Sequence, residues 1–415
     1  MNKTKIIATI GPSSKDKEVI KGLIDAGMDV ARINMTYSSP KFCKEVVDTI
    51  NELNEQLDTN IAIMFDLKGP CLNIGKFVRG EATFTEGTKI RVYKDINIMG
   101  DETKFTIDYE DLIDDLYEDD EIKVDDGHVS FRVLSKGEDY LLCEVENGGV
   151  LRDGMICIIP GLNLKGPFLS EKDKEDIILA NKLDVDFIAV SFIRDHEDLL
   201  SVNDILINMG NDHIGIIGKI ENEASLQDID EIIKVADGVM IARGDLGVEV
   251  EIERVPGIQK NILSKCHDAG KIGIVATEML SSMEENSTPT RAEVSDIANA
   301  VLDGADAVML SGETTIGSYP VETIRVLEKI LTTAELDLDS SLFMDRAIRT
   351  ENKDTTGMIS YSVAECANHL KAKAIFAPTI SGYTAKKISR FNLFKRISSS
   401  NYNFISFTCI EYIFG

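Results

Sequence analysis

The chain has 415 residues, more than one small hydrophobic core can organise, and this length predicts two or three domains. Its hydrophobic fraction of 43% and charged fraction of 28% are typical of a globular protein, and no apolar run is long enough to span a membrane. The 71 acidic residues exceed the 44 Lys and Arg, and the net charge of −27 argues against a surface that binds nucleic acid or anionic membranes.

The cysteines and histidines show no metal-binding or disulfide pattern. Seven Cys are scattered without a CxxC pair, and the five His are isolated. The first residues lack a signal-peptide core and enter a predicted strand directly. We therefore expect reduced thiols and a cytoplasmic location.

The N-terminal segment alternates short apolar strands with helices. Its pattern predicts strands at residues 5–10, 30–35 and 61–66, separated by helices at residues 15–26 and 40–57. Gly27 is expected to cap the first helix. From about residue 73 to residue 163 the helices disappear, and short alternating strands with glycine turns predict an all-β insertion.

Strands and helices alternate again from residue 170. Ser170 and Asp173 predict the N-cap and the acidic first turn of a helix over residues 170–183. A single acidic amphipathic helix is expected between residues 221 and 238. Further apolar runs predict strands at residues 187–192, 214–221, 238–243, 273–280 and 307–312.

Eight apolar strands separated by helices favour a closed (β/α)8 TIM barrel, an α/β fold. Apolar runs without polar alternation indicate parallel strands covered by helices, and eight such units over about 250 residues match the size of this barrel. A doubly wound open sheet is the alternative, but it would have a GxGxxG turn after its first strand, where this chain has TIGPSS. The insertion after strand 3 would lie over the barrel mouth as a lid.

Polar residues mark the predicted carboxyl ends of the strands, where barrel enzymes have their active sites. The set comprises Thr9, Arg32, Asn34, Asp66, Ser191, Lys219, Glu221, Arg243, Asp245, Thr277 and residues 311–313.

Lys219 and Glu221 share one face of a strand because they are two residues apart. With Asp245 from the neighbouring strand, they could hold a divalent metal beside a phosphoryl group. The alternative is a solvated strand end with a satisfied ion pair. The whole set predicts an enzyme that uses a metal to handle a phosphoryl group or an enolate.

At this point the motifs resemble those of the pyruvate kinase family, in family order, from residue 4 to about residue 390. They include TKIIATIGPSS, GMDVARIN, FDLKGP, VDDGHVSF, KIEN, ARGDLGVE, ATEML and PTRAEVSDIANAV. The resemblance implies phosphoryl transfer from phosphoenolpyruvate to ADP, giving pyruvate and ATP. It also implies a barrel (residues 1–72 and 164–345), an all-β lid domain (residues 73–163) and a truncated α/β C-terminal domain (residues 346–415).

The resemblance assigns roles to the residues at the strand ends. Lys219 resembles the catalytic lysine, Arg32 the arginine that grips the substrate phosphate, and Thr277 the threonine tied to enolate protonation. Glu221 and Asp245 match the Mg2+ ligands, while Gly244 and Asp245 open a short helix whose N–H groups receive the substrate carboxylate. For Arg32 the alternative is an ion pair, and for Thr277 a hydroxyl that bonds the backbone.

The family also uses K+, and the matching ligands are Asn34, Thr36, Asp66 and the carbonyl of Leu67. Asn34 and Asp66 could instead cap the loops that follow their strands.

Three residues depart from the family pattern on the nucleotide side, and a fourth departs at a position linked to the K+ requirement. Tyr37 replaces a histidine, Asn73 an arginine and Pro160 a lysine, and these losses predict weaker ADP binding. Cys71 stands where K+-dependent members have Glu and K+-independent members have Lys.

Residues 353–390 resemble the start of the family's C-terminal domain, and the resemblance ends after Phe391. The family's homotetramer uses this domain, so a tetramer is not carried over to this chain. A loop there resembles one that holds an effector phosphate in some members; a structural turn is the alternative. Its residues are Thr379, Ser381, Gly382 and Thr384.

Two other functions stay open beside the kinase. One is a relative that binds phosphoenolpyruvate and metal without turning over ADP, because the nucleotide side has changed. The other is a different magnesium-dependent barrel enzyme that handles an enolate, such as a pyruvate-forming aldolase. A binding module without a site at the barrel mouth fits the converging strand ends least well.

Overall fold

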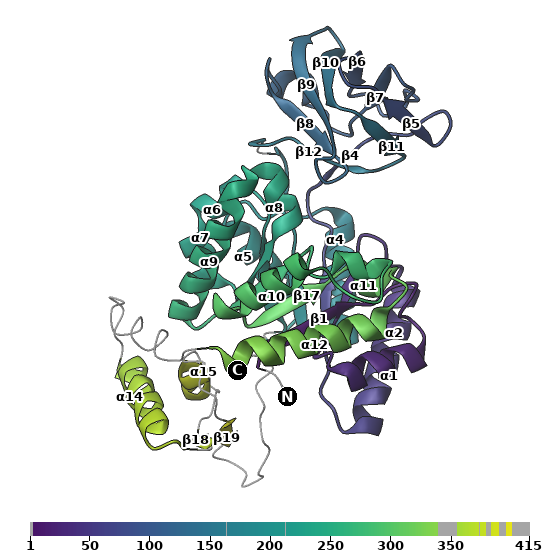
Figure 1. Cartoon of the computed structure of the whole chain (residues 1–415). Helices are drawn as coiled ribbons and strands as arrows, with labels where there is room; N and C mark the ends of the chain where they lie inside the picture. The colour runs from purple at the N-terminus through teal and green to yellow at the C-terminus, as the bar shows by residue number, and fades with distance from the viewer. Residues whose placement is uncertain are drawn as a thin grey trace.

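The computed structural model describes residues 3–162, 164–211, 213–338, 355–372, 374–378 and 383–389, together with the backbone of 396–400. Its centre is a closed barrel of parallel strands in the order β1-β17-β16-β15-β14-β13-β3-β2 (Figure 1). This confirms the predicted (β/α)8 barrel. The barrel strands are β1 (Lys5–Thr9), β2 (Val30–Asn34), β3 (Ala62–Asp66), β13 (Phe187–Val190), β14 (Gly215–Ile220), β15 (Gly238–Ala242), β16 (Ile272–Ala276) and β17 (Ala307–Leu310).

Helices surround the barrel and connect its strands (Figure 1). They are α1 (Lys17–Ala26), α2 (Pro40–Leu57), α4 (Glu171–Leu183), α5 (His196–Asn208), α6 (Glu223–Gln227), α7 (Ile229–Val235), α8 (Arg243–Glu249), α9 (Val255–Ala269), α10 (Arg291–Leu302), α11 (Gly312–Thr315) and α12 (Pro320–Leu336), with the 3-10 turns η1 (Ile252–Arg254) and η2 (Ser281–Glu284). No helix in the described part of the chain is both long and apolar enough to cross a bilayer.

Local sequence signals explain where these helices begin and end. Gly27 ends α1 in the left-handed region at φ 118°, and its N–H donates to the carbonyls of Leu23 and Ile24. Ser170 and Asp173 form a reciprocal capping box at the start of α4. Both predicted caps are therefore confirmed.

The predicted single helix between β14 and β15 is wrong. The segment forms two helices, α6 and α7, which meet at Asp228. The carboxylate of Asp228 accepts the backbone N–H of His196 at 2.8 Å and lies 2.7 Å from its ring Nδ1. Asp228, held in this way by the start of α5, is the point where one helix ends and the next begins.

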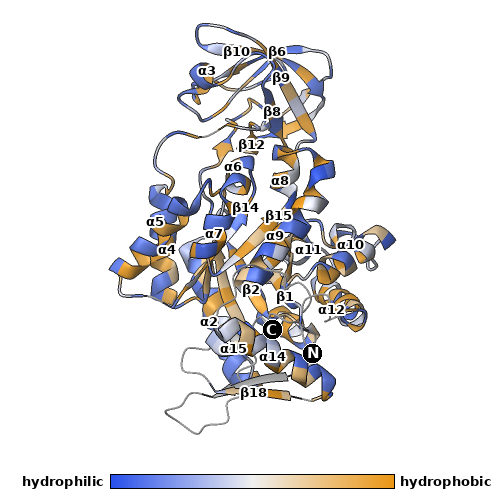
Figure 2. Cartoon of the chain, turned by 90° about the vertical axis from the view of Figure 1, so that its left-hand side faces the viewer, coloured by the Kyte–Doolittle hydropathy of each residue, from blue (hydrophilic) through white to orange (hydrophobic). Residues whose placement is uncertain are grey.

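Apolar side chains fill the barrel and the layer between strands and helices. The interior contains Ile7, Met64, Ile217 and Met240, all fully shielded from solvent. Figure 2 shows the orange strands inside a layer of helices whose outer surfaces carry blue residues. This pattern is the one expected for parallel strands that are buried on both faces.

A ring of aspartates closes the amino-terminal end of the barrel. Asp29, Asp186, Asp237 and Asp306 each stand immediately before a strand, at every second position around the barrel. Each carboxylate accepts a backbone N–H from one neighbouring strand at 2.7–2.9 Å. Each carbonyl accepts an N–H from the strand on the other side, at 2.8–3.2 Å. The ring therefore links all the barrel strands.

The insertion after β3, predicted as a lid over residues 73–163, forms a β unit drawn at the top of Figure 1, and it is called the lid below. Its core includes Phe84, Phe105 and Phe131, with ring centroids 5.0–5.8 Å apart. The predicted β structure is present, but residues 112–115 form a short helix. Its elements, with the hinge strand β4, are β4 (Leu72–Asn73), β5 (Glu81–Phe84), β6 (Lys89–Tyr93), β7 (Lys104–Thr106), α3 (Leu112–Asp115), β8 (Glu121–Val124), β9 (Val129–Lys136), β10 (Tyr140–Asn147), β11 (Gly149–Arg152) and β12 (Ile156–Ile158).

The C-terminal elements follow α12. They are α14 (Thr355–His369), β18 (Ala374–Pro378), α15 (Tyr383–Ser389) and β19 (Arg396–Ser400). Strands β18 and β19 pair in parallel, as an α/β unit requires. The predicted domain boundary between residues 345 and 346 lies outside the described residues.

Candidate active site

Buried charged side chains meet at the carboxyl end of the barrel. Lys219 on β14 places Nζ 2.7 Å from the Ser191 hydroxyl, 3.4 Å from Asp66 Oδ1 and 2.8 Å from Glu221 Oε1. Ser191 donates in turn to Asp66 Oδ1 at 3.2 Å. Arg32 on β2 donates through Nε to the other oxygen of Asp66 at 2.6 Å and through Nη1 to the Thr9 hydroxyl at 2.8 Å.

These ion pairs stay charged at neutral pH. Burial alone would raise the pKa of Asp66, but Arg32 and Lys219 outweigh it and hold that pKa below its usual value. Burial would lower the pKa of Lys219, yet Asp66 and Glu221 raise it above the ordinary range. The site thus presents two cations whose charges are only partly balanced by Asp66.

A second pair of carboxylates, Glu221 and Asp245, lies beside Lys219. Burial raises the pKa of Asp245 to about 7, and the nearby Glu221 carboxylate raises it further. Glu221 Oε1 is buried and accepts no well-directed hydrogen bond, so it pairs with Lys219 through charge alone. Two buried oxygen donors that repel one another fit a hard divalent cation such as Mg2+.

The donor count agrees with such a cation. The described residues contain no group of three or more His, Cys, Asp and Glu arranged to hold a metal. Mg2+ commonly takes one or two protein carboxylates and fills its other positions with water and substrate phosphates. Glu221 and Asp245 match that pattern.

Helix α8 begins at this site, directly after β15. The N–H of Gly244 donates to the Thr277 hydroxyl at 2.8 Å, and this hydroxyl donates to the carbonyl of Ala276 at 2.6 Å. Thr277 therefore bonds backbone in this structure, as its alternative interpretation had it. The Gly244 N–H predicted to receive a substrate carboxylate has a partner that substrate would have to displace.

Arg243 holds the Thr277 loop in place. Its guanidinium donates to the carbonyls of Ala276 and Thr277 at 3.3 and 2.7 Å and to Asp296 at 2.7 Å. Thr277 has a φ of 68°, a left-handed conformation that costs on the order of 1–3 kcal/mol for a β-branched residue. Arg243 therefore stabilises a strained loop.

Phe192 shows the same kind of strain beside Glu221. Its φ is 54°, and its N–H donates to Glu221 Oε2 at 2.5 Å. This contact fixes one oxygen of Glu221 and leaves the other toward Lys219. The carboxylate is therefore oriented before any metal binds.

The four residues predicted to bind K+ lie at the ends of β2 and β3. Asn34 and Asp66 are paired across these strands, and Leu67 follows directly. The Asn34 side-chain oxygen accepts the N–H of Thr36 at 3.0 Å, which is also a loop-capping contact. The structure brings the set together, and a cation role stays a prediction.

Of the residues that depart from the family pattern, Cys71, Asn73 and Pro160 lie where the chain enters and leaves the lid. Tyr37 lies between β2 and α2 and is 81% exposed. The Asn73 side chain is used twice, because it accepts from Lys68 Nζ and donates to the Gly154 carbonyl, each at 2.9 Å. Burial raises the pKa of the Cys71 thiol, so Cys71 is a neutral side chain at the hinge.

Two lid segments contact the last turn of α8. Lys123 donates to the carbonyl of Val248 at 2.9 Å, and the Gly161 N–H donates to Glu249 at 2.9 Å. The lid carboxylate of Asp126 also lies near enough to Asp245 to raise its pKa. Sequence reasoning missed these residues, although Asp126 falls within the VDDGHVSF motif.

The predicted effector loop is only partly described. Thr379, Ser381 and Gly382 lie outside the described residues, while Thr384 lies in α15. The effector site therefore stays a prediction.

A closed parallel barrel that holds two cations beside paired carboxylates, under a β lid, defines a class of barrel enzymes that act on anionic substrates. The pyruvate kinase barrel-domain family matches residues 1–324. Over 94% of this chain, the pyruvate kinase of Clostridium perfringens is 43% identical and that of Clostridium acetobutylicum 39% identical, each covered over 83% of its length. The crystal structure of a pyruvate kinase from Cryptosporidium parvum superposes with a TM-score of 0.90 at 33% identity, covering 96% of this chain and 83% of the other.

The chain belongs to the pyruvate kinase family and is a phosphotransferase.

Proposed function

We propose that the site at the barrel mouth transfers a phosphoryl group from phosphoenolpyruvate to ADP, giving pyruvate and ATP, with Mg2+ and with assistance from K+. The observation that carries this proposal is the meeting of Arg32, Lys219, Glu221 and Asp245 at one end of the barrel. An anionic substrate needs the cations, and a divalent ion needs the carboxylates.

Arg32 and Lys219 bind and orient the phosphoryl group. Both are already positioned by Asp66, so little reorganisation is needed when substrate enters. Lys219 would then move its charge toward the oxygens that become more negative as the phosphoryl group leaves. Its raised pKa keeps it protonated throughout.

Glu221 and Asp245 would hold Mg2+, which supplies positive charge to the phosphoryl and enolate oxygens when it is bound. Asn34, Thr36, Asp66 and the Leu67 carbonyl would hold K+ through neutral and anionic oxygens. Oxygen donors of this kind suit a hard monovalent cation.

Gly244 and Thr277 act at the enolate end of the substrate. We propose that the substrate carboxylate takes over the Gly244 N–H that Thr277 now accepts. The Thr277 hydroxyl is then released toward the enolate carbon. Because its own pKa is too high for a lone acid, it would pass a proton from water.

One observation favours a second candidate, a binder of phosphoenolpyruvate and metal with weak or absent ADP turnover. The Asn73 amide is engaged by Lys68 and Gly154, and it supplies no cation for a nucleotide phosphate.

A cytoplasmic location is also part of the proposal, and the six described cysteines are free thiols, which agrees with it.

The test is pyruvate formation from phosphoenolpyruvate and ADP with Mg2+, with and without K+. Lys219→Met should lower kcat by at least about a hundredfold, because a charge aimed at the transition state is lost. Lys182→Met, at an exposed lysine of α4, is the matched control and should retain activity.

Two other results separate the candidate functions. Magnesium-dependent binding of phosphoenolpyruvate by calorimetry, without pyruvate formation in folded protein, would support the second candidate. A folded protein that showed neither binding of phosphoenolpyruvate nor pyruvate formation would rule out both candidate functions.

The K+ requirement is tested separately. Cys71→Lys should bring the ratio of activities with and without K+ close to one, since the added ammonium would replace the monovalent cation.

A further inference from the structure

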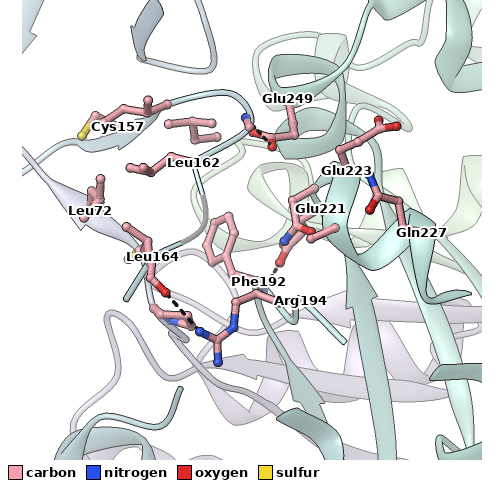
Figure 3. A pocket seen from close by; sticks show the side chains of 17 residues that line it. Leu72, Cys157, Leu162, Leu164, Phe192, Arg194, Glu221, Glu223, Gln227 and Glu249 are labelled. Carbon is pink, nitrogen blue, oxygen red and sulfur yellow. Dashed lines mark hydrogen bonds between the residues drawn. The ribbon is translucent and has the colours of Figure 1, made fainter. Parts of the chain in front are cut away.

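A pocket lies at the seam between the lid and the barrel, separate from the two cations of the active site. Its cavity volume is about 190 Å³. Figure 3 shows Leu72, Leu162 and Leu164 on one side and Phe192, Glu221 and Glu223 on the other. Neither Arg32 nor Lys219 lines it. Glu221 is a residue that both lines the pocket and belongs to the proposed metal site.

The walls of this pocket are largely apolar. Leu72 belongs to β4, Leu162 and Leu164 to the segment that returns from the lid, and Phe192 follows β13. The volume is below the roughly 300–1,000 Å³ of pockets for drug-sized ligands, so the pocket suits a compact body such as one ring. Such a body would bury its surface against side chains from both the lid connections and the barrel.

The charged groups of the pocket leave an excess of negative charge. Arg194 is occupied, because it forms a two-point pair with Asp198 at 2.7 and 3.0 Å and donates to the Leu164 carbonyl at 3.1 Å. Glu249 accepts the Gly161 N–H at 2.9 Å and has no ion-pair partner among the described residues.

The other two carboxylates of the pocket already have cationic partners. Among the described residues, Glu223 pairs with the exposed Arg254 at 3.3 Å. Glu221 Oε1 lies 2.8 Å from Lys219 Nζ, so Glu249 carries the excess negative charge. The net charge of −27 for the whole chain adds to the attraction for a cation.

We propose that this pocket binds a small organic ammonium ion with a compact apolar body, its ammonium group at Glu249 and Glu223 and its body against Leu72, Leu162 and Phe192. A metal ion alone would leave the apolar walls without a partner, and a neutral molecule would leave Glu249 without a cationic partner among the described residues. The occupant would contact both lid connections and the barrel at once. It would therefore restrain the lid at its hinge.

The probe for this proposal is benzylammonium chloride, with benzyl alcohol as its neutral analogue, titrated by calorimetry at constant ionic strength in saturating Mg2+. We expect saturable binding of benzylammonium with a Kd below about 1 mM. Benzyl alcohol should bind at least about fivefold more weakly, since it lacks the charge interaction with partly buried carboxylates.

Two variants locate the site. Ala224→Phe fills the pocket from α6 and should abolish binding. Glu249→Gln keeps an oxygen acceptor for the Gly161 N–H but removes the charge, so it should weaken benzylammonium by about fivefold and leave benzyl alcohol unchanged. Glu253→Gln, at an exposed position outside the pocket, is the control and should bind like the parent.

Several outcomes would overturn the proposal. Equal affinity for benzylammonium and benzyl alcohol would show that charge does not contribute to binding. Benzylammonium binding that occurs without Mg2+ but is absent in saturating Mg2+ would mean that the probe had occupied the metal carboxylates. Benzylammonium binding that is unchanged in Ala224→Phe would show that the binding site lies outside this pocket. None of these readings depends on turnover, so they stand apart from the test of the kinase activity.

Discussion

Arg32 and Asp66 form a buried ion pair across neighbouring barrel strands, with Nε 2.6 Å from Oδ2. The Arg32 side chain is 8% exposed and that of Asp66 is 2% exposed. Because Asp66 also faces Lys219, one carboxylate holds both cations that the proposed reaction needs. Removing its charge would leave Arg32 without a carboxylate partner among the described residues and would leave Lys219 with Glu221 alone.

Asp66→Asn should therefore reduce both stability and activity. We expect the free energy of unfolding to fall by about 2–3 kcal/mol, since hydrogen bonds to charged groups are lost in a buried site. The measurement is urea denaturation followed by circular dichroism. Asp25→Asn is the control, because its pair with Lys21 is exposed and worth no more than about 0.5 kcal/mol. Equal losses in the two variants would contradict the special status of the buried pair.

Arg243→Met should impair catalysis through the Thr277 loop. Its side chain bonds the carbonyls of Ala276 and Thr277, and without it the left-handed Thr277 would relax. Steady-state kinetics should give a fall in kcat/KM for phosphoenolpyruvate of about tenfold, the value of one charge-assisted hydrogen bond. Arg325→Met, at an exposed arginine of α12, should be neutral. An unchanged kcat/KM would show that the loop holds its shape without Arg243.

Lys123→Met tests whether the lid is positioned by α8. The lost bond to the Val248 carbonyl should let the lid rest in more orientations, so the apparent KM for phosphoenolpyruvate should rise about two- to fivefold. The comparison is Lys89→Met, at an exposed lysine on β6 of the same lid. A change in thermal stability alone, with kinetics intact, would make Lys123 structural rather than positioning.

Asp306→Asn should change stability in a pH-dependent way. Burial raises the folded pKa of Asp306 to about 6 from an ordinary value of 3.8. The folded state therefore binds this proton more tightly, and the stability it contributes is present below about pH 4 and lost as the pH rises through about 6.

Asparagine does not titrate, so the variant avoids this loss. The difference in unfolding free energy should shift in its favour by about 3 kcal/mol between pH 4 and pH 7. Urea denaturation at several pH values measures this shift. A difference that does not change with pH, or one that shifts toward the parent protein, would show that the Asp306 pKa is not raised.

The sequence predicted the barrel well because its signals are local. The apolar runs at β1, β2 and β3, the left-handed cap at Gly27 and the capping box at Ser170 each depend on a few neighbouring residues. The strand ends followed from the barrel itself, since parallel strands bring their carboxyl ends to one mouth.

Features that depend on contacts between distant segments could not be predicted in this way. The break between α6 and α7 depends on Asp228 binding His196 at the start of α5. The hydroxyl of Thr277 engages Gly244 across two barrel units, and Lys123 of the lid reaches Val248. No periodicity within one segment encodes which distant carbonyl or amide its side chain will meet.

The aspartate ring at the amino-terminal end of the barrel has a consequence for how the barrel unfolds. Because Asp29, Asp186, Asp237 and Asp306 each join two neighbouring strands, no junction between strands is left without such a tie. Since all the junctions between neighbouring barrel strands have this tie, we expect the barrel strands to separate together rather than one pair at a time. Backbone amides of the barrel should therefore exchange their hydrogens in a single cooperative unfolding event. Those of the hinged lid should exchange at different rates, because the lid can open independently of the barrel.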